Sequence, residues 1–142
     1  MPQDLPQDLP GKLDPRFFGA WRLESVDREE AATGRKLDAD VQHAGYIAYT
    51  PDGRMSVIIS HKSPAKTEVT SYAAQWSVEG GQVIHDVDIS ARPSWVGTRQ
   101  LRGFVFEGDR LTLSPPESPD YVHGLVTRRS LHWRRVAPQT SN

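Results

Sequence analysis

The sequence predicts an all-β protein: an eight-stranded antiparallel up-and-down barrel with an internal cavity. Three observations support this prediction, namely short runs of alternating apolar and polar residues, tight-turn dipeptides between these runs, and no sustained 3.6-residue periodicity. The expected strands lie at 19–27, 44–50, 54–61, 71–79, 82–90, 98–107, 110–115 and 125–135. Consecutive antiparallel strands lose their exposed edges when the first pairs with the last. A barrel of this size either fills with side chains or holds one small ligand.

Length and composition limit what the protein can be. A chain of 142 residues suits one domain with a single core. The formal net charge of -1 argues against nucleic acid or an anionic membrane as a partner. Because cysteine is absent, disulfides, thiolate metal sites and cysteine nucleophiles are excluded. No apolar run is long enough to span a bilayer and no signal peptide precedes the domain, so we expect a cytoplasmic protein.

Proline-rich and polar segments mark the expected limits of the domain. Residues 1–16 contain two copies of Pro-Gln-Asp-Leu followed by further prolines, which predicts a disordered extension. The polar residues 137–142 are expected to form a flexible tail. The barrel then occupies 17–136, with loops expected at 31–41 and 63–70.

Turn residues set the register of the early hairpins. In the first strand, alternation directs Trp21 and Leu23 inward. The turn Pro51-Asp52-Gly53 suits a type I turn with a glycine bulge. Its flanking strands then share an inner face, made of Ile47, Tyr49, Met55, Val57, Ile59 and, at the barrel mouth, His61.

A second hairpin is expected at Gly80-Gly81, because two glycines supply the positive φ angles of a type I′ turn. The turn predicts four facing pairs on the inner face: Val78 with Val83, Trp76 with His85, Ala74 with Val87, and Tyr72 with Ile89.

A third hairpin turns on Gly108-Asp109 and pairs Phe106 with Leu111 and Phe104 with Leu113. The same alternation directs Gln100 and Arg102 inward. In the last strand it directs Arg129, Leu131 and Trp133 inward.

Polar side chains in the predicted interior are the candidate functional residues, because a buried imidazole or guanidinium needs a partner, water or ligand. His85 could move a proton or bind a ligand oxygen, or it could be a core histidine satisfied by a neighbouring hydroxyl or water. Arg102 with Gln100 could hold an anionic oxygen, or Arg102 could pair with a structural carboxylate or stack on Trp21 at the barrel floor. Arg129 is interpreted as a packing or floor residue.

Several other motifs carry little weight. His85 and Asp86 point to opposite faces of a strand, so we expect no metal site. The basic residues at 128, 129, 134 and 135 divide between two faces, which argues against a nucleic-acid stripe. The sequence lacks a nucleophile elbow and a phosphate-binding glycine loop.

A combination of segments resembles the bacterial and fungal lipocalin-like domain family. They are 18–25 (Phe-Gly-Ala-Trp-Arg-Leu-Glu-Ser), 45–56 (beginning Gly-Tyr-Ile-Ala-Tyr-Thr-Pro-Asp-Gly), 83–85, 93–102 and 108–113. The resemblance implies a calycin-type barrel with a ligand cavity, and it includes relatives that act as cyclases or isomerases in natural-product pathways. It places the family's recurrent polar positions on His85, Trp95, Gln100 and Arg102. The chain departs from the family at Asp86, where a second histidine is common, and in a shorter segment after His61.

The resulting hypothesis is a barrel that binds a small hydrophobic, oxygen-bearing molecule and catalyses its cofactor-free cyclisation or isomerisation in natural-product biosynthesis. His85, Arg102 and Gln100 are the expected catalytic residues. The expected ligand contacts are His61, Tyr49, Tyr72, Trp76, Trp95 and Phe104. The alternatives are a non-catalytic carrier or sensor, and a barrel with a filled interior. No cofactor, metal, nucleic acid or membrane is expected, and a homodimer is left open.

Overall fold

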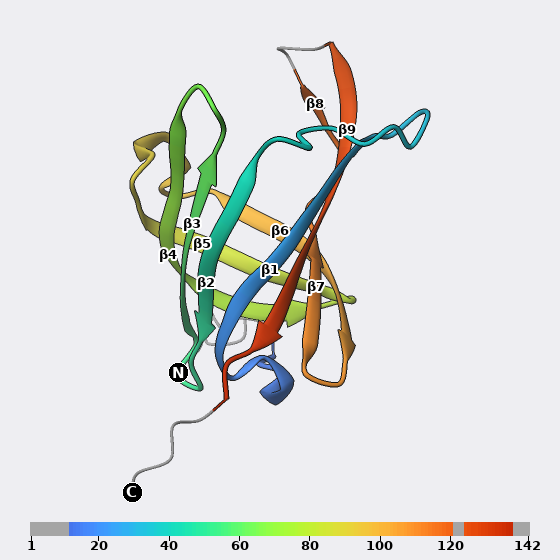
Figure 1. Cartoon of the computed structure of the whole chain (residues 1–142). Helices are drawn as coiled ribbons and strands as arrows, with labels where there is room; N and C mark the ends of the chain where they lie inside the picture. Colours follow the sequence, from blue (N-terminus) through green and yellow to red (C-terminus); the bar gives the residue numbers. More distant parts are fainter. Residues whose placement is uncertain (1–11, 121–123, 138–142) are drawn as a thin grey trace, which may run out of the picture.

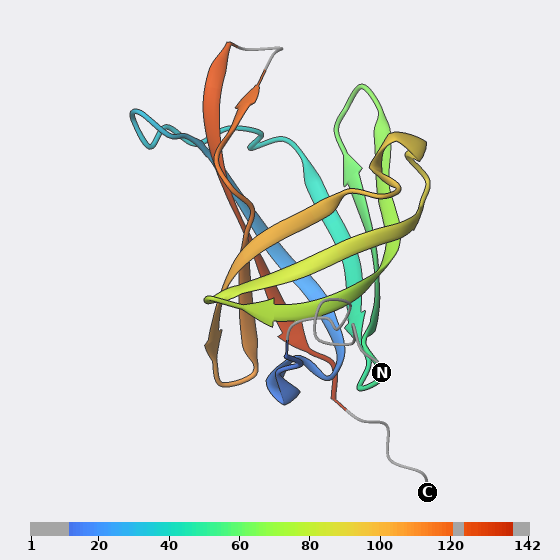
Figure 2. The same ribbon diagram turned by 180° about the vertical axis from the view of Figure 1, so that it is seen from behind.

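In the computed structural model, which describes residues 12–120 and 124–137, antiparallel strands form a closed barrel (Figures 1 and 2). The strands are β1 (Gly19–Glu30), β2 (Gln42–Tyr49), β3 (Arg54–Lys62), β4 (Thr67–Glu79), β5 (Gln82–Ser90), β6 (Arg99–Glu107), β7 (Arg110–Ser114), β8 (Ser118–Asp120) and β9 (Leu125–Arg135). Their order is β1-β2-β3-β4-β5-β6-β7-β9-β8, and β9 also pairs with β1. Helical structure in the described residues is limited to two three-residue turns, η1 (Pro15–Phe17) and η2 (Pro93–Trp95).

The predicted all-β, eight-stranded antiparallel barrel is confirmed. Each expected strand is present, and β8 is a short addition that pairs only with the first residues of β9. Strand β8 was not predicted, because its three residues include a proline and are too few to show alternation. Within the described residues, no helix is long and apolar enough to cross a bilayer.

Most predicted hairpin registers are also confirmed. Trp76 faces His85 and Phe104 faces Leu113, and Tyr49 and Met55 lie on one inner face, where they pair with each other. The turn glycines explain this success, since Gly53 has a φ of 86° and so adopts the left-handed conformation that its bulge requires. In these hairpins the pairing of residues between the two strands is therefore set by the glycines of the short turn.

The predicted pairing of Tyr72 with Ile89 is wrong. A bulge shifts the register, so that Ala73 faces Ile89 and Tyr72 faces Ser90. Asp88 is the extra residue on β5, and beyond it the alternation reverses. Ile89 consequently points outward, with 66% of its surface exposed, while Tyr72 remains buried.

The predicted loop at 63–70 is also longer than the observed one. Strands β3 and β4 continue to Lys62 and Thr67, which leaves a four-residue turn closed by a 2.9 Å hydrogen bond from Ser63 N to Lys66 O. The expected loop at 31–41 is present between β1 and β2. The longer β3–β4 hairpin extends the barrel wall at the upper end in Figure 1.

The turn η1 lies at the lower end of the barrel in Figure 1, and its side chains pack into that end. Phe17 is fully buried, with its ring centroid 5.0 Å from that of Tyr49 and 4.9 Å from that of Phe106. Arg135 lies over the Trp21 ring at 4.2 Å and donates hydrogen bonds to the carbonyl oxygens of Phe18 and Arg16. Arg135, rather than Arg102 or Arg129, is therefore the floor arginine of this barrel.

The two ends of the predicted domain are only partly described. Lys12 forms an isolated bridge with Val78, so the chain already contacts the barrel before η1 begins. Residues 1–11 of the expected extension and 138–142 of the expected tail lie outside the described residues.

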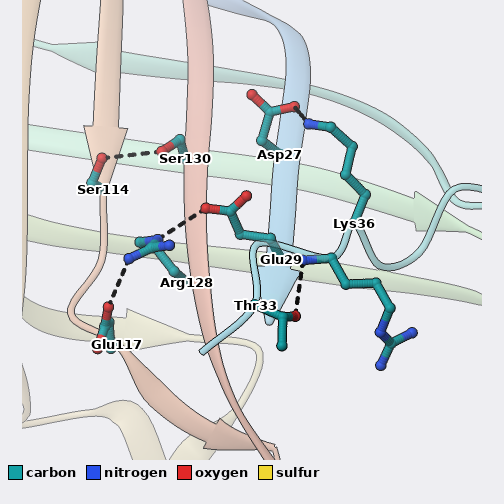
Figure 3. Close-up of polar contacts among 9 residues, drawn as sticks. Asp27, Glu29, Thr33, Lys36, Ser114, Glu117, Arg128 and Ser130 are labelled. Atoms are coloured by element: carbon teal, nitrogen blue, oxygen red, sulfur yellow. Dashed lines mark hydrogen bonds and ion pairs between the residues drawn. The ribbon is translucent and has the colours of Figure 1, made fainter. Parts of the chain in front are cut away.

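Charged side chains cover the outer face where β1 and β9 close the barrel (Figure 3). Arg128 donates to Glu29 at 3.0 Å and to Glu117 at 3.2 Å. Lys36 lies 3.9 Å from Asp27 on the neighbouring part of β1. Because alternate residues of a strand face opposite sides, the next residue, Arg129, points into the barrel.

Candidate functional site

A cavity of about 80 Å³ lies inside the barrel, between side chains of β2–β7 and β9 and Trp95 of η2. Its walls are mainly apolar and include Ile47, Val57, Ile59, Leu113, Leu131 and Trp133. Its polar side chains are His61, Thr70, Tyr72, His85, Arg102 and Arg129. The predicted internal cavity is therefore present, with room for several water-sized groups.

His85 is held between two tyrosines. Tyr49 Oη lies 2.8 Å from Nε2 of His85, and Tyr72 Oη lies 2.7 Å from Nδ1. A neutral imidazole has one donor and one acceptor nitrogen, so one tyrosine hydroxyl donates to the ring and the other accepts from it. The three side chains come from β2, β4 and β5, and they satisfy one another inside the barrel.

Burial keeps this group of three side chains uncharged. It lowers the pKa of His85 from 6.5 to about 3, and the nearby Arg102 guanidinium acts in the same direction. Burial also raises the pKa of Tyr49 and of Tyr72 above the usual value of 10.0. The imidazole is therefore neutral at physiological pH, with both nitrogens occupied.

Arg102 and Gln100 lie together, as predicted. Arg102 Nη1 donates to the carbonyl oxygen of Leu101 at 2.8 Å, and Nη2 lies 3.5 Å from Gln100 Oε1. Gln100 donates in turn to Thr98 Oγ1 at 2.9 Å. No carboxylate of residues 12–118 or 124–137 pairs with Arg102, and its guanidinium lines the cavity.

Arg129 contributes a second guanidinium to the cavity. Burial lowers its pKa, and the positive charges of Arg102 and Arg28 lower it further. Within the described part of the chain, Arg129 makes no side-chain hydrogen bond or ion pair. Sequence reasoning interpreted this residue as a packing or floor residue, but the structure places it beside the ligand space.

The upper rim carries a histidine pair that includes a residue missed from sequence. His43 Nδ1 lies 2.9 Å from His61 Nδ1, and His61 Nε2 lies 3.2 Å from Thr70 Oγ1. Burial lowers the pKa of both histidines. Had the second strand been started two residues earlier, at Gln42, the register would have paired His43 with His61.

Trp95 lies at the same rim, in η2. Its ring centroid is 5.9 Å from that of Tyr72, and the Arg92 guanidinium lies 4.6 Å from the centre of the indole. Trp95 and His61 line the cavity, as does Tyr72. These three of the expected ligand-contacting residues are therefore brought together.

Other expected site residues lie below the cavity. Trp76 is fully buried, donates from Nε1 to the carbonyl oxygen of Thr50 at 3.1 Å, and packs on Phe17. Phe104 also packs on Phe17, with 5.0 Å between ring centroids. Tyr49 reaches the cavity only through His85. Ligand contact by these aromatic residues, like the catalytic roles of His85, Arg102 and Gln100, stays a prediction.

Comparison with known proteins identifies two similarities. The family profile described as a lipocalin-like domain matches residues 65–136. The 4'-hydroxy-3'-methoxypropiophenone carrier protein ppsC of Aspergillus oryzae is 40% identical over 106 residues, which are 75% of this chain and 79% of that protein.

Proposed function

Because this chain belongs to the lipocalin-like domain family, we propose that it is a carrier that binds a small, hydrophobic, oxygen-bearing aromatic molecule in its barrel and releases it unchanged. The cavity is the observation that supports this proposal most directly. Its walls are apolar, and the guanidinium groups of Arg102 and Arg129 provide donors for a ligand oxygen. The relative that is named as a carrier of a phenolic aryl ketone suggests the chemical class.

The hydrogen bonds and the neutral charge of His85 favour a carrier function over acid–base catalysis. A general acid or base must reach the proton it transfers, and its pKa should lie near the working pH. Both nitrogens of His85 are instead engaged by tyrosines, and burial disfavours its cation. Cofactor-free cyclisation or isomerisation remains the second candidate, since Arg102 could stabilise negative charge developing on a ligand oxygen.

Binding is tested by calorimetric titration with 4'-hydroxy-3'-methoxypropiophenone. We expect saturable binding to one site per chain. Replacing the cavity-lining Leu131 with Trp should fill the space and weaken binding by about tenfold or more. The control is Val105→Trp on the exposed face of β6, which should bind like the wild type. Absence of binding to the wild-type protein would contradict the carrier proposal for this class of ligand.

Catalysis is tested with the same ketone in D₂O. An enzyme that promotes enolisation accelerates exchange of the protons on the carbon next to the carbonyl, which NMR detects. For a carrier we expect the same exchange rate with and without the protein, and the ketone recovered unchanged. Accelerated exchange that disappears in His85→Gln, while affinity stays within about tenfold, would establish the catalytic candidate instead.

A further inference from the structure

Hydrogen-bond donors exceed acceptors around the cavity. The guanidinium groups of Arg102 and Arg129 both line it, and each carries five N–H donors. Trp133 also contributes to the wall, and its indole N–H is buried with no hydrogen-bond partner among the residues that the structure describes. Arg102 uses two of its donors on Leu101 O and Gln100 Oε1, and the remaining donors exceed the acceptors of the described side chains around the cavity.

The other polar groups supply neutral acceptors to Arg102 and no anionic one. Tyr49 and Tyr72 share their hydroxyl groups with the two nitrogens of His85. The Tyr72 hydroxyl also has Arg102 as a hydrogen-bonding neighbour, but it is a neutral group and adds no negative charge. His61 is engaged with His43 and Thr70. Of the Asp and Glu side chains that the structure describes, in residues 12–118 and 124–137, none lines the cavity. Two positive charges therefore face a small, mainly apolar space without a negative charge to balance them.

The adjacent residues Arg128 and Arg129 show how unusual this arrangement is within the same strand. Arg128 points outward and is paired with Glu29 and Glu117 (Figure 3). Arg129 points inward, and the charges of Arg102 and Arg28 act against its own. Arg28 already has Asp38 as an ion-pair partner, so its charge is balanced locally. The unbalanced pair in the interior is Arg102 with Arg129.

We propose that the ligand is bound as an aromatic oxyanion, such as a phenolate, with its negatively charged oxygen held between Arg102 and Arg129. This inference rests on the proposed carrier function and specifies the charge state of the ligand. For a phenol, the O–H bond breaks and the proton leaves to solvent, while the oxygen accepts hydrogen bonds from the guanidinium groups. The flat ring then lies against the apolar wall, and two like charges gain a shared counter-ion.

The test follows the ionisation of 4'-hydroxy-3'-methoxypropiophenone by its absorption spectrum, since phenol and phenolate absorb at different wavelengths. Bound to the wild-type protein, its phenol pKa should fall by about one unit or more, which corresponds to about tenfold tighter binding of the anion. The methyl ether 3',4'-dimethoxypropiophenone cannot ionise. We expect it to bind more weakly than the phenolate, with an affinity that does not follow the ionisation of the phenol.

The variants Arg129→Gln and Arg128→Gln form a matched pair. Arg129→Gln should lose most of the shift in the ligand's pKa and still bind the ether within about threefold of wild type. Arg128→Gln should keep the wild-type shift, because its guanidinium lies on the outer face. Without ligand, the Tm of Arg129→Gln should be at least that of the wild type, because the substitution removes a largely buried cation that has no ion-pair partner among the described side chains. This measurement also shows that the variant folds.

The outcomes separate the two proposals. Equal binding of the phenol and the ether, with no change in the phenol's pKa, would overturn the oxyanion inference and leave the carrier proposal standing. The oxyanion inference is also wrong if the ligand's pKa shifts equally in Arg129→Gln and Arg128→Gln. If neither compound binds the wild-type protein, the carrier proposal fails for aryl ketones and the inference fails with it.

Discussion

At the scale of single residues, His85 shows how a histidine can be accommodated in an apolar interior. Only 1% of its surface is exposed, and its two nitrogens lie within hydrogen-bond distance of the Tyr49 and Tyr72 hydroxyl groups. A buried polar atom that loses its partner costs more than the bond itself contributes, because it cannot return to water. His85 and the two tyrosines therefore depend on one another.

Removing one hydroxyl tests this dependence. Tyr49→Phe leaves Nε2 of His85 without its partner, so the free energy of unfolding should fall by about 1–3 kcal/mol. Urea denaturation measures the change. The matched control is Tyr46→Phe on β2, whose side chain is half exposed and should change stability by less than about 0.5 kcal/mol. Equal effects of the two substitutions would show that the Tyr49–His85 bond does not stabilise the fold.

Part of the arrangement around His85 can be predicted from the sequence. The Gly80-Gly81 turn predicts that His85 is inside and opposite Trp76, because the register follows from two residues adjacent in the chain. The partnership with Tyr49 could not be predicted in the same way. Tyr49 lies on β2, and the stagger between β2 and β5 depends on barrel closure rather than on one turn.

At the scale of strands, the errors arise where no residue marks the irregularity. The bulge on β5 involves Asp88, whose carboxylate pairs on the outside with Arg54 at 2.7 Å. A surface aspartate in a strand is not by itself a sign of a bulge. Ile89 consequently fits the predicted apolar alternation and yet lies outside. Turn glycines carry a local signal, whereas this bulge depends on contacts made across the sheet.

Gly45 and Gly103 give a matched test of how closely neighbouring strands approach. A Cβ added at Gly45 would lie 2.4 Å from the carbonyl oxygen of Ile58, whereas one at Gly103 would lie 3.8 Å from its nearest neighbour. Gly45→Ala should therefore destabilise the protein by about 1–3 kcal/mol, and Gly103→Ala should be neutral or slightly stabilising. The two variants are compared by the urea concentration at which half of the protein is unfolded. Similar midpoints for the two variants would mean that β2 can move away from β3 at little cost.

At the scale of the whole molecule, buried histidines make stability depend on pH. The folded protein favours neutral His43, His61 and His85, because burial lowers the pKa of each below the usual value of 6.5. The unfolded chain then binds more protons below pH 6.5. Their contribution is fully present above that pH and is lost as the pH falls toward the lower folded-state values.

This dependence is measurable by urea denaturation between pH 7 and about pH 4.5, a range in which most carboxylates stay ionised. We expect the free energy of unfolding to fall over this range, with His85 accounting for on the order of 3 kcal/mol. His85→Gln should remove that part of the decrease, because an amide does not titrate. An unchanged pH dependence in this variant would contradict the buried, neutral state of His85.

The positions of the inward-pointing arginines along the barrel axis depend on the complete barrel and not on the sequence pattern alone. Alternation correctly predicts that Arg102, Gln100 and Arg129 point inward. It does not predict which inward arginine reaches the floor, because height in the barrel depends on strand tilt and stagger. Arg135 takes the floor position over Trp21, which leaves Arg129 beside the cavity.

The packed lower end, with Phe17 at its centre, has a kinetic consequence. Since aromatic side chains pack that end, a ligand of the proposed kind would enter and leave past the rim that carries His61 and Trp95. A side chain that only narrows this passage slows entry and exit by the same factor, because both cross one barrier. The fraction of protein that holds ligand at equilibrium is then unchanged. Substitutions at the rim would alter only how long the ligand stays bound.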